Sequence, residues 1–143
     1  MGLLDKVKFH VGDSVKFVIS KIEKWRPRNC KSEKDYENSL YKFLHDELGD
    51  FQITKQYAKG RIRADLVIGE KVIVELKYNL NTTAKYQKLI GQLAEYKDWD
   101  GRTILLLTGE TDINLRKQIG MYLKKEGLSE DLLDEAKVTV FQK

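Results

Sequence analysis

A carboxylate and an ammonium group lie two residues apart in the stretch IVELKYN, at Glu75 and Lys77. The stretch has the composition of a β-strand, and strand side chains alternate between faces, so the two groups would share one face. A carboxylate can bind a hard cation, and an ammonium can offset the charge of an anion. The pair is therefore either half of an active site or an ordinary charged strand edge.

The position of a second acid, Asp65, depends on the register of a predicted hairpin, RIRADLVIGEKVIVELK. A two-residue loop would set Asp65 opposite Val74, whereas a three-residue loop sets it opposite Glu75. The three-residue loop also pairs Leu66 with Val74 and makes one wholly apolar face. Because three-residue hairpin loops are common, we favour this register.

Two opposing carboxylates at these positions would have Cβ atoms about 5 Å apart and would repel each other. A divalent cation removes the repulsion, because Mg²⁺ takes oxygen ligands and commonly uses one or two protein carboxylates. The hairpin is therefore a candidate for half of a metal site, with exposed charges on an open sheet face as the alternative.

A third acid, Glu37, lies in a helix predicted to run from the capping residue Ser32 to Leu48. At about 100° per residue, Glu37 falls in the middle of the apolar stripe that contains Leu44 and Leu48. A carboxylate in that position must be paired or must bind a metal. Glu33 shares the face but lies at the helix start, where the helix dipole explains it.

A later helix, predicted over about residues 83–97, carries Gln92 at the edge of the face marked by Leu89 and Leu93. Tyr96 follows one turn on. A boundary glutamine that hydrogen-bonds to backbone is the alternative to a functional role.

The other elements are predicted from apolar runs and turn residues. Strands are expected over residues 51–58, 61–68, 71–78, 102–109 and 137–142, and a further helix over 112–126. The order of helix, three strands, helix, strand, helix and strand predicts an α/β protein with a mixed central sheet flanked by helices.

The single proline, Pro27, predicts a boundary between an N-terminal extension, residues 1–31, and the main domain, residues 32–143. Apolar spacing predicts a helix over about residues 14–26. Before it, the alternation in KVKFHV leaves a strand open as an alternative. The apolar extension is a candidate interface for a homodimer.

The composition sets broad limits on function. The chain has 143 residues, a net charge of +4 and a pI of about 9.0, which is compatible with a polyanion partner. Its single cysteine excludes a disulfide framework and a cysteine-based zinc cluster. No apolar run is long enough to span a membrane, and no signal-peptide pattern is present, so we expect a cytoplasmic protein.

Together these residues resemble the PD-(D/E)XK nuclease superfamily, and within it the RecB-like branch. The motifs are the helical acid Glu37 in DYENSLYKFL, Asp65 in GRIRADLVI and the Glu-x-Lys of VELKYN. Gln92 and Tyr96 in GQLAEY match the Gln-x-x-x-Tyr of the RecB-like branch. The match covers about residues 33–108 and implies a restriction-endonuclease-like αβββαβ core. The residue directly before Asp65 is Ala64 rather than proline, and the histidine that RecB-like members often carry shortly before the helical acid is missing before Glu37.

The resemblance implies hydrolysis of phosphodiester bonds in DNA with Mg²⁺ or Mn²⁺. The implied metal ligands are Asp65, Glu75, the backbone carbonyl of Leu76, and Glu37 through water or on a second ion. Lys77 would orient the attacking water or help to deprotonate it. Gln92 would position Lys77, the water or the DNA backbone.

Basic residues near these positions would contact DNA phosphates, because such contacts dominate nucleic-acid affinity. The candidates are Arg61, Arg63, Lys85 and Lys88, with Tyr96 stacking on a base or simply packing. Two alternatives remain: a catalytically degenerate nucleic-acid-binding module of the same fold, and an interaction subunit whose acids form salt bridges. Exonuclease or endonuclease action is left open.

Overall fold

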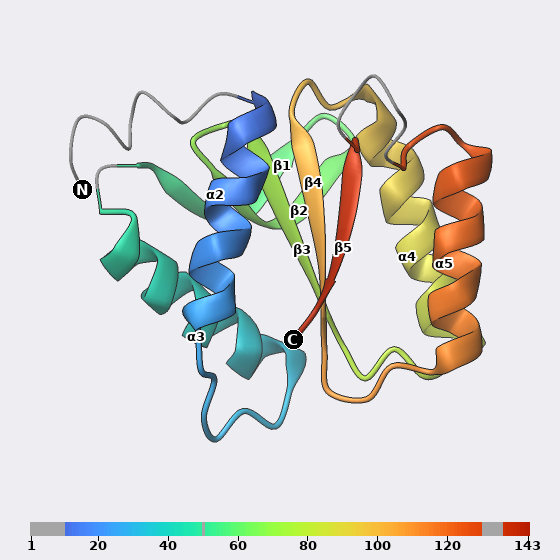
Figure 1. The fold of residues 1–143 in the computed structure, drawn as a ribbon, viewed down its shortest axis with the longest axis horizontal. Helices are drawn as coiled ribbons and strands as arrows, with labels where there is room; N and C mark the ends of the chain where they lie inside the picture. Colours follow the sequence, from blue (N-terminus) through green and yellow to red (C-terminus); the bar gives the residue numbers. More distant parts are fainter. Residues whose placement is uncertain (1–10, 50, 130–135) are drawn as a thin grey trace.

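In a computed structural model, residues 11–49, 51–129 and 136–143 are described, and they contain four α-helices and one five-stranded sheet (Figure 1). The helices are α2 (Val11–Lys24), α3 (Glu33–Glu47), α4 (Thr83–Glu95) and α5 (Ile113–Lys125), with a 3-10 turn, η1 (Tyr96–Asp98), after α4. The strands are β1 (Ile53–Lys59), β2 (Ile62–Ile68), β3 (Val72–Tyr78), β4 (Arg102–Thr108) and β5 (Val138–Gln142). This confirms the predicted α/β class and the order of its elements.

The sheet is mixed, and its strands are ordered β1-β2-β3-β4-β5. The first three strands are antiparallel, and β3, β4 and β5 are parallel. Parallel neighbours need a crossover connection, and here α4 and α5 provide it. The β4 sequence RTILLLT is almost wholly buried, because helices cover both faces of this part of the sheet.

The β2–β3 hairpin has the predicted three-residue loop, with Ile68 paired to Val72 and Leu66 paired to Val74. Gly69 and Glu70 in the loop have φ values of 58° and 56°, in the left-handed region. This register places Leu66, Ile68, Val72 and Val74 together in the first hydrophobic core, which is the wholly apolar face that favoured it in the sequence, whereas Val67 and Ile73 are buried on the other face. Backbone pairing ends at Leu66 and Val74, one residue before Asp65.

Helices lie in two layers, with α2 and α3 against one face of the sheet and α4 and α5 against the other (Figure 1). Each layer closes its own hydrophobic core: Leu40 and Leu44 of α3 belong to the first, and Leu89 and Leu93 of α4 to the second. Helix α3 begins at the predicted cap, since the Ser32 side chain accepts a hydrogen bond from the N–H of Asp35.

The apolar face of α2 is covered by the chain itself. Val15, Val18 and Ile22 are buried in the first core, and the Trp25 indole just beyond the helix donates to Ser39 of α3 at 3.1 Å. These side chains therefore offer no surface to a second copy, and a homodimer through residues 1–31 stays a prediction, as does the domain boundary. The alternation in KVKFHV lies, up to His10, outside the described residues.

None of the helices that the structure describes combines the length and the apolar content needed to cross a bilayer.

Candidate active site

Asp65 and Glu75 lie side by side where the backbone pairing of β2 is interrupted. The Asp65 carboxylate, through Oδ2, accepts the backbone N–H of Leu76 at 2.9 Å. The pairing between β1 and β2 also omits Asp65, which lies opposite Gln56 of β1. Burial raises the pKa of Glu75 well above its ordinary value, and the neighbouring Asp65 carboxylate raises it further. The two acids therefore share one side of the sheet, as the register predicted.

The Glu75 carboxylate is fully buried in the centre of the site. Its Oε2 contacts the hydroxyl of Tyr96, which also lies 2.6 Å from the backbone carbonyl of Arg63. A hydroxyl has one proton and can donate to only one of two acceptors. The Tyr96 hydroxyl is therefore shared between two acceptors, and its bond to Glu75 lowers the pKa of Glu75 by less than burial raises it.

The second carboxylate oxygen of Glu75, Oε1, faces Lys77. The Lys77 Nζ lies 3.7 Å from it, longer than a hydrogen bond. Among the described residues, Oε1 is buried without a hydrogen-bond partner. Such a group carries a large desolvation penalty, so its persistence points to a ligand that would satisfy it. Glu75 and Lys77 thus share a strand face, as predicted, without neutralising each other fully.

Glu37 points inward from α3, as its helical phase predicted, and is only 8% exposed. Its Oε1 accepts a 2.6 Å hydrogen bond from Nε2 of Gln56. Burial raises the pKa of Glu37, the bond from Gln56 lowers it, and the nearby Asp65 raises it. Gln56 reaches Glu37 from the middle of β1 with φ at 51°, a conformation that is rare for glutamine and typical of functional positions.

A pocket of about 220 Å³ lies beside Asp65 and Lys77. Its lining includes Glu33, Gln56, Arg63, Asp65, Lys77, Lys88 and Gln92. Gln92 comes from α4, and its Oε1 is buried without a hydrogen-bond partner among the described residues. This oxygen therefore makes none of the backbone hydrogen bonds that were the alternative in the sequence.

Asp65 and Glu75 fit a hard divalent cation by their chemistry, because Mg²⁺ is usually held by one or two carboxylates and several waters. The unpartnered Oε1 of Glu75 is an oxygen that a cation would satisfy. Within residues 11–49, 51–129 and 136–143, no group of three or more His, Cys, Asp or Glu side chains is arranged to hold a metal ion. A role for Glu37, through water or on a second ion, stays a prediction. The role of the Leu76 carbonyl stays a prediction.

The predicted nucleic-acid contacts divide into exposed basic groups and one buried ring. Arg61 and Arg63 line a neighbouring pocket of about 300 Å³ with Lys88, and Lys85 lies on the same exposed side of α4. Tyr96 is only 2% exposed. Its ring cannot stack on a base in this conformation, because it packs in the second core and binds Glu75 through its hydroxyl.

Three site residues are not identified by the sequence patterns. The helix dipole accounts for Glu33 in the sequence, yet its carboxylate also accepts the backbone N–H of Tyr78 at 3.2 Å and lines the pocket. Gln56 positions Glu37, and Tyr78 follows Lys77 at the end of β3. Their residue types are common in strands and at helix starts, so the types alone do not mark them as site residues. Only their position next to predicted site residues could have identified them.

Comparison with known proteins adds no assignment, since no family model, curated protein sequence or solved structure matches the chain.

Proposed function

We propose that this chain is a Mg²⁺- or Mn²⁺-dependent nuclease that hydrolyses phosphodiester bonds in DNA. One observation carries the proposal: Asp65 and Glu75 form a carboxylate pair at the break in β2, and Lys77 lies 3.7 Å from the buried, unpartnered Oε1 of Glu75. A buried, unpartnered carboxylate oxygen next to a second acid is unfavourable without a ligand, and this favours a bound cation, with a phosphate beside Lys77.

The order of elements supports the proposal. Helix α3, strands β1 to β3, helix α4 and strand β4 follow the αβββαβ order of the restriction-endonuclease-like core of the PD-(D/E)XK nucleases. The carboxylates come from the antiparallel hairpin, and Glu37 and Gln92 approach from the helices on either side of it in sequence. This is the distribution that the resemblance implies.

The roles follow from what each side chain can bind. A divalent cation held by Asp65 and Glu75 would lower the pKa of a water and offset negative charge on the scissile phosphate. Lys77 orients the attacking water and adds positive charge beside the phosphate. The Gln92 amide binds the water or a phosphate oxygen. Exposed basic residues such as Lys88 hold the strand through its phosphates.

A degenerate nucleic-acid-binding module is the second candidate. The observation in its favour is that, in the described ranges, no third His, Cys, Asp or Glu joins Asp65 and Glu75 in a group arranged to hold a metal ion. Such a module would keep the basic surface and bind DNA in a salt-dependent way, without metal-dependent turnover.

The deciding experiment measures cleavage of single-stranded, duplex and branched DNA with Mg²⁺, with Mn²⁺ and with chelator, and follows product length. Lys77→Met removes the ammonium and keeps most of the buried stem, because the Lys77 side chain is only 12% exposed. Loss of a proton-transfer or charge-stabilising group should slow cleavage by about 100-fold or more.

Lys117→Met on the exposed side of α5 is the matched control and should cleave at the wild-type rate. Both variants carry the same chemical change and the same purification history. Equal rates for the Lys77→Met variant and the wild type, or cleavage that persists in chelator, would rule out the nuclease assignment. Salt-sensitive binding with no cleavage would support the degenerate module.

A further inference from the structure

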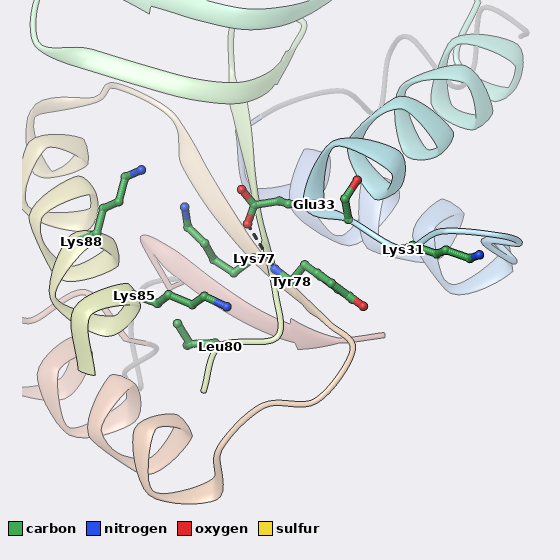
Figure 2. Close-up of a pocket in the computed structure, with 8 residues that line it drawn as sticks. Lys31, Glu33, Lys77, Tyr78, Leu80, Lys85 and Lys88 are labelled. Carbon is green, nitrogen blue, oxygen red and sulfur yellow. Dashed lines mark hydrogen bonds between the residues drawn. The ribbon is translucent and has the colours of Figure 1, made fainter. Parts of the chain in front are cut away.

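A larger pocket, of about 440 Å³, adjoins the carboxylate site (Figure 2). It lies between the start of α3, the end of β3 and the first turns of α4. Ligands of α/β proteins commonly bind beyond the carboxyl ends of parallel strands, and β3 is the first strand of the parallel half of this sheet. The volume falls within the range of small-molecule sites.

The two pockets adjoin each other and share part of their lining. Glu33, Lys77 and Lys88 line both of them. Lys77 is the residue that faces Glu75, so one ligand can lie in the larger pocket and reach the carboxylate pair with its next bonded group. A polymer with one unit in each pocket fits this arrangement better than a separate small molecule does.

Charge in the larger pocket is unevenly distributed. Figure 2 shows Lys77, Lys85 and Lys88 along one side, with Glu33 and Tyr78 on the other. With Lys31, four lysines and one carboxylate line the pocket, which makes it net positive. Lys85 is held in place by the Asn79 carbonyl at 3.0 Å. A phosphate group is the ligand that such a lysine wall binds.

Tyr78 forms another part of the wall and packs against a second aromatic ring behind it. The Tyr78 ring lies 5.0 Å from the Tyr36 ring at an interplanar angle of 32°, and Trp25 packs edge-on against Tyr36 at 6.3 Å. Tyr78 is half-buried, so its ring is held by this pair while part of it stays accessible. Nucleic-acid bases stack on aromatic side chains of this kind without regard to sequence.

We propose that this pocket receives one unpaired nucleotide next to the scissile phosphate, with its phosphate on the lysines and its base against Tyr78. The inference rests on the proposed nuclease function and names its substrate class. A base inside an intact duplex cannot leave the stack without unpairing. The site therefore prefers single-stranded or locally opened DNA to intact duplex.

The test measures binding in chelator, so that no cleavage occurs. A fluorescent oligonucleotide of mixed sequence is titrated with protein, first as a single strand and then annealed into a blunt duplex, at several salt concentrations. We expect tighter binding of the single strand. A duplex that binds as tightly or more tightly would overturn the inference.

Lys85→Glu tests the lysine wall without disturbing α4. The Thr82 side chain already accepts the N–H of Lys85, so a glutamate there would complete a capping box and the helix should be retained. The slope of log affinity against log salt should fall by about 0.7, the value for one phosphate on a single strand. Lys117→Glu on α5 is the control and should leave the slope unchanged.

Tyr78→Leu tests the base, because it removes the ring and keeps an apolar side chain. Single-strand affinity should fall by roughly tenfold with an unchanged salt slope, whereas Tyr78→Phe should bind like the wild type. Unchanged affinity in folded Tyr78→Leu protein would show that the base does not contact Tyr78. If that variant does not fold, the salt slope of Lys85→Glu decides alone.

The nuclease function and the nucleotide pocket can be contradicted independently of each other. Single-strand binding that depends on Lys85 and Tyr78, in a protein that cleaves no DNA, would support the pocket and contradict the nuclease. Metal-dependent cleavage of duplex by a protein whose binding ignores both variants would support the nuclease and contradict the pocket.

Discussion

The Asp65 carboxylate accepts a hydrogen bond of 2.9 Å from the backbone N–H of Leu76, the residue that follows Glu75. One side chain thereby replaces the backbone contact that would have continued the β2–β3 ladder. The bond fixes the direction of the Asp65 carboxylate relative to the strand that carries Glu75. The geometry of the acid pair is thus set by the hairpin itself and precedes any bound ion.

Substitution of Asp65 should separate this structural bond from metal binding. Asp65→Asn keeps an oxygen for the Leu76 N–H, so its free energy of unfolding should stay near that of the wild type. Asp65→Ala loses the bond and should be less stable by about 1 kcal/mol in urea titration. Calorimetry with Mn²⁺ should show weaker binding in both variants, since both lack the charge. If the Asp65→Asn variant binds Mn²⁺ as tightly as the wild type does, Asp65 is not a metal ligand.

The pH dependence of stability should report on Glu75. Its pKa is raised in the folded protein above the ordinary value of 4.5, so the folded state binds the proton more tightly than the unfolded chain does. The resulting stability is fully present below pH 4.5 and is lost as the pH rises through the raised folded pKa. The glutamine in the Glu75→Gln variant cannot ionise, so this variant should not lose that stability as the pH rises. In chelator, the variant should gain roughly 1–3 kcal/mol over the wild type in neutral to alkaline buffer, with the gain shrinking towards low pH.

Glu126→Gln is the control for that experiment, because the stability that Glu126 contributes should depend on pH in the opposite direction. The hydrogen bond from Lys97 lowers the pKa of Glu126, so its carboxylate contributes stability that is present above its ordinary pKa and lost as the pH falls through the lowered one. This variant should therefore be slightly less stable than the wild type at neutral pH. A pH-independent gain in Glu75→Gln would show that the acid is not buried as described.

Removal of one hydroxyl tests the role of Tyr96. Tyr96→Phe keeps the packed ring and takes away the partner of both Glu75 and the Arg63 carbonyl. The free energy of unfolding should fall by about 1–3 kcal/mol, because buried polar groups lose their hydrogen bonds. Tyr122→Phe on α5 should change stability by less than about 0.5 kcal/mol. Equal losses in the two variants would contradict a specific role for the Tyr96 hydroxyl.

Gln92 offers a test in which stability and activity move in different directions. Its Oε1 is buried without a partner among the described residues, so Gln92→Leu should be as stable as the wild type or up to about 1 kcal/mol more stable. Cleavage of DNA should nevertheless be slower, since the amide is proposed to bind water or phosphate. Gln118→Leu on the exposed side of α5 should affect neither. Full activity in Gln92→Leu would make the residue structural.

The register of the hairpin and the phase of α3 are predictable because each depends on a local periodicity. Pairing Leu66 with Val74 creates one apolar face, and a slip by one residue would expose it, so the apolar pattern alone selects the register. The position of Glu37 follows from the 3.6-residue repeat in the same way. These two periodicities are enough to bring Asp65, Glu75 and Glu37 to one region of the fold.

Other parts of the site depend on packing that no local pattern encodes. The left-handed backbone of Gln56 is not foreseeable, because glutamine is not a residue that signals positive φ and KQY resembles an ordinary strand. The hydrogen bond from the Tyr78 N–H to Glu33 joins residues 45 positions apart. It exists only because α3 packs across the end of β3. The burial of Tyr96 is likewise set by how η1 meets the sheet.

The strands of the sheet lie in the order in which they occur in the sequence. During synthesis from the N-terminus, each new strand therefore finds its neighbour already made, and none has to insert between two earlier ones. The acids and Lys77 all precede β4, whereas the tyrosine and strands that enclose Glu75 come later. The carboxylate hairpin can thus form while Glu75 is still hydrated. The desolvation of that acid falls on the later docking of the parallel half, so we expect this step of folding to depend on pH.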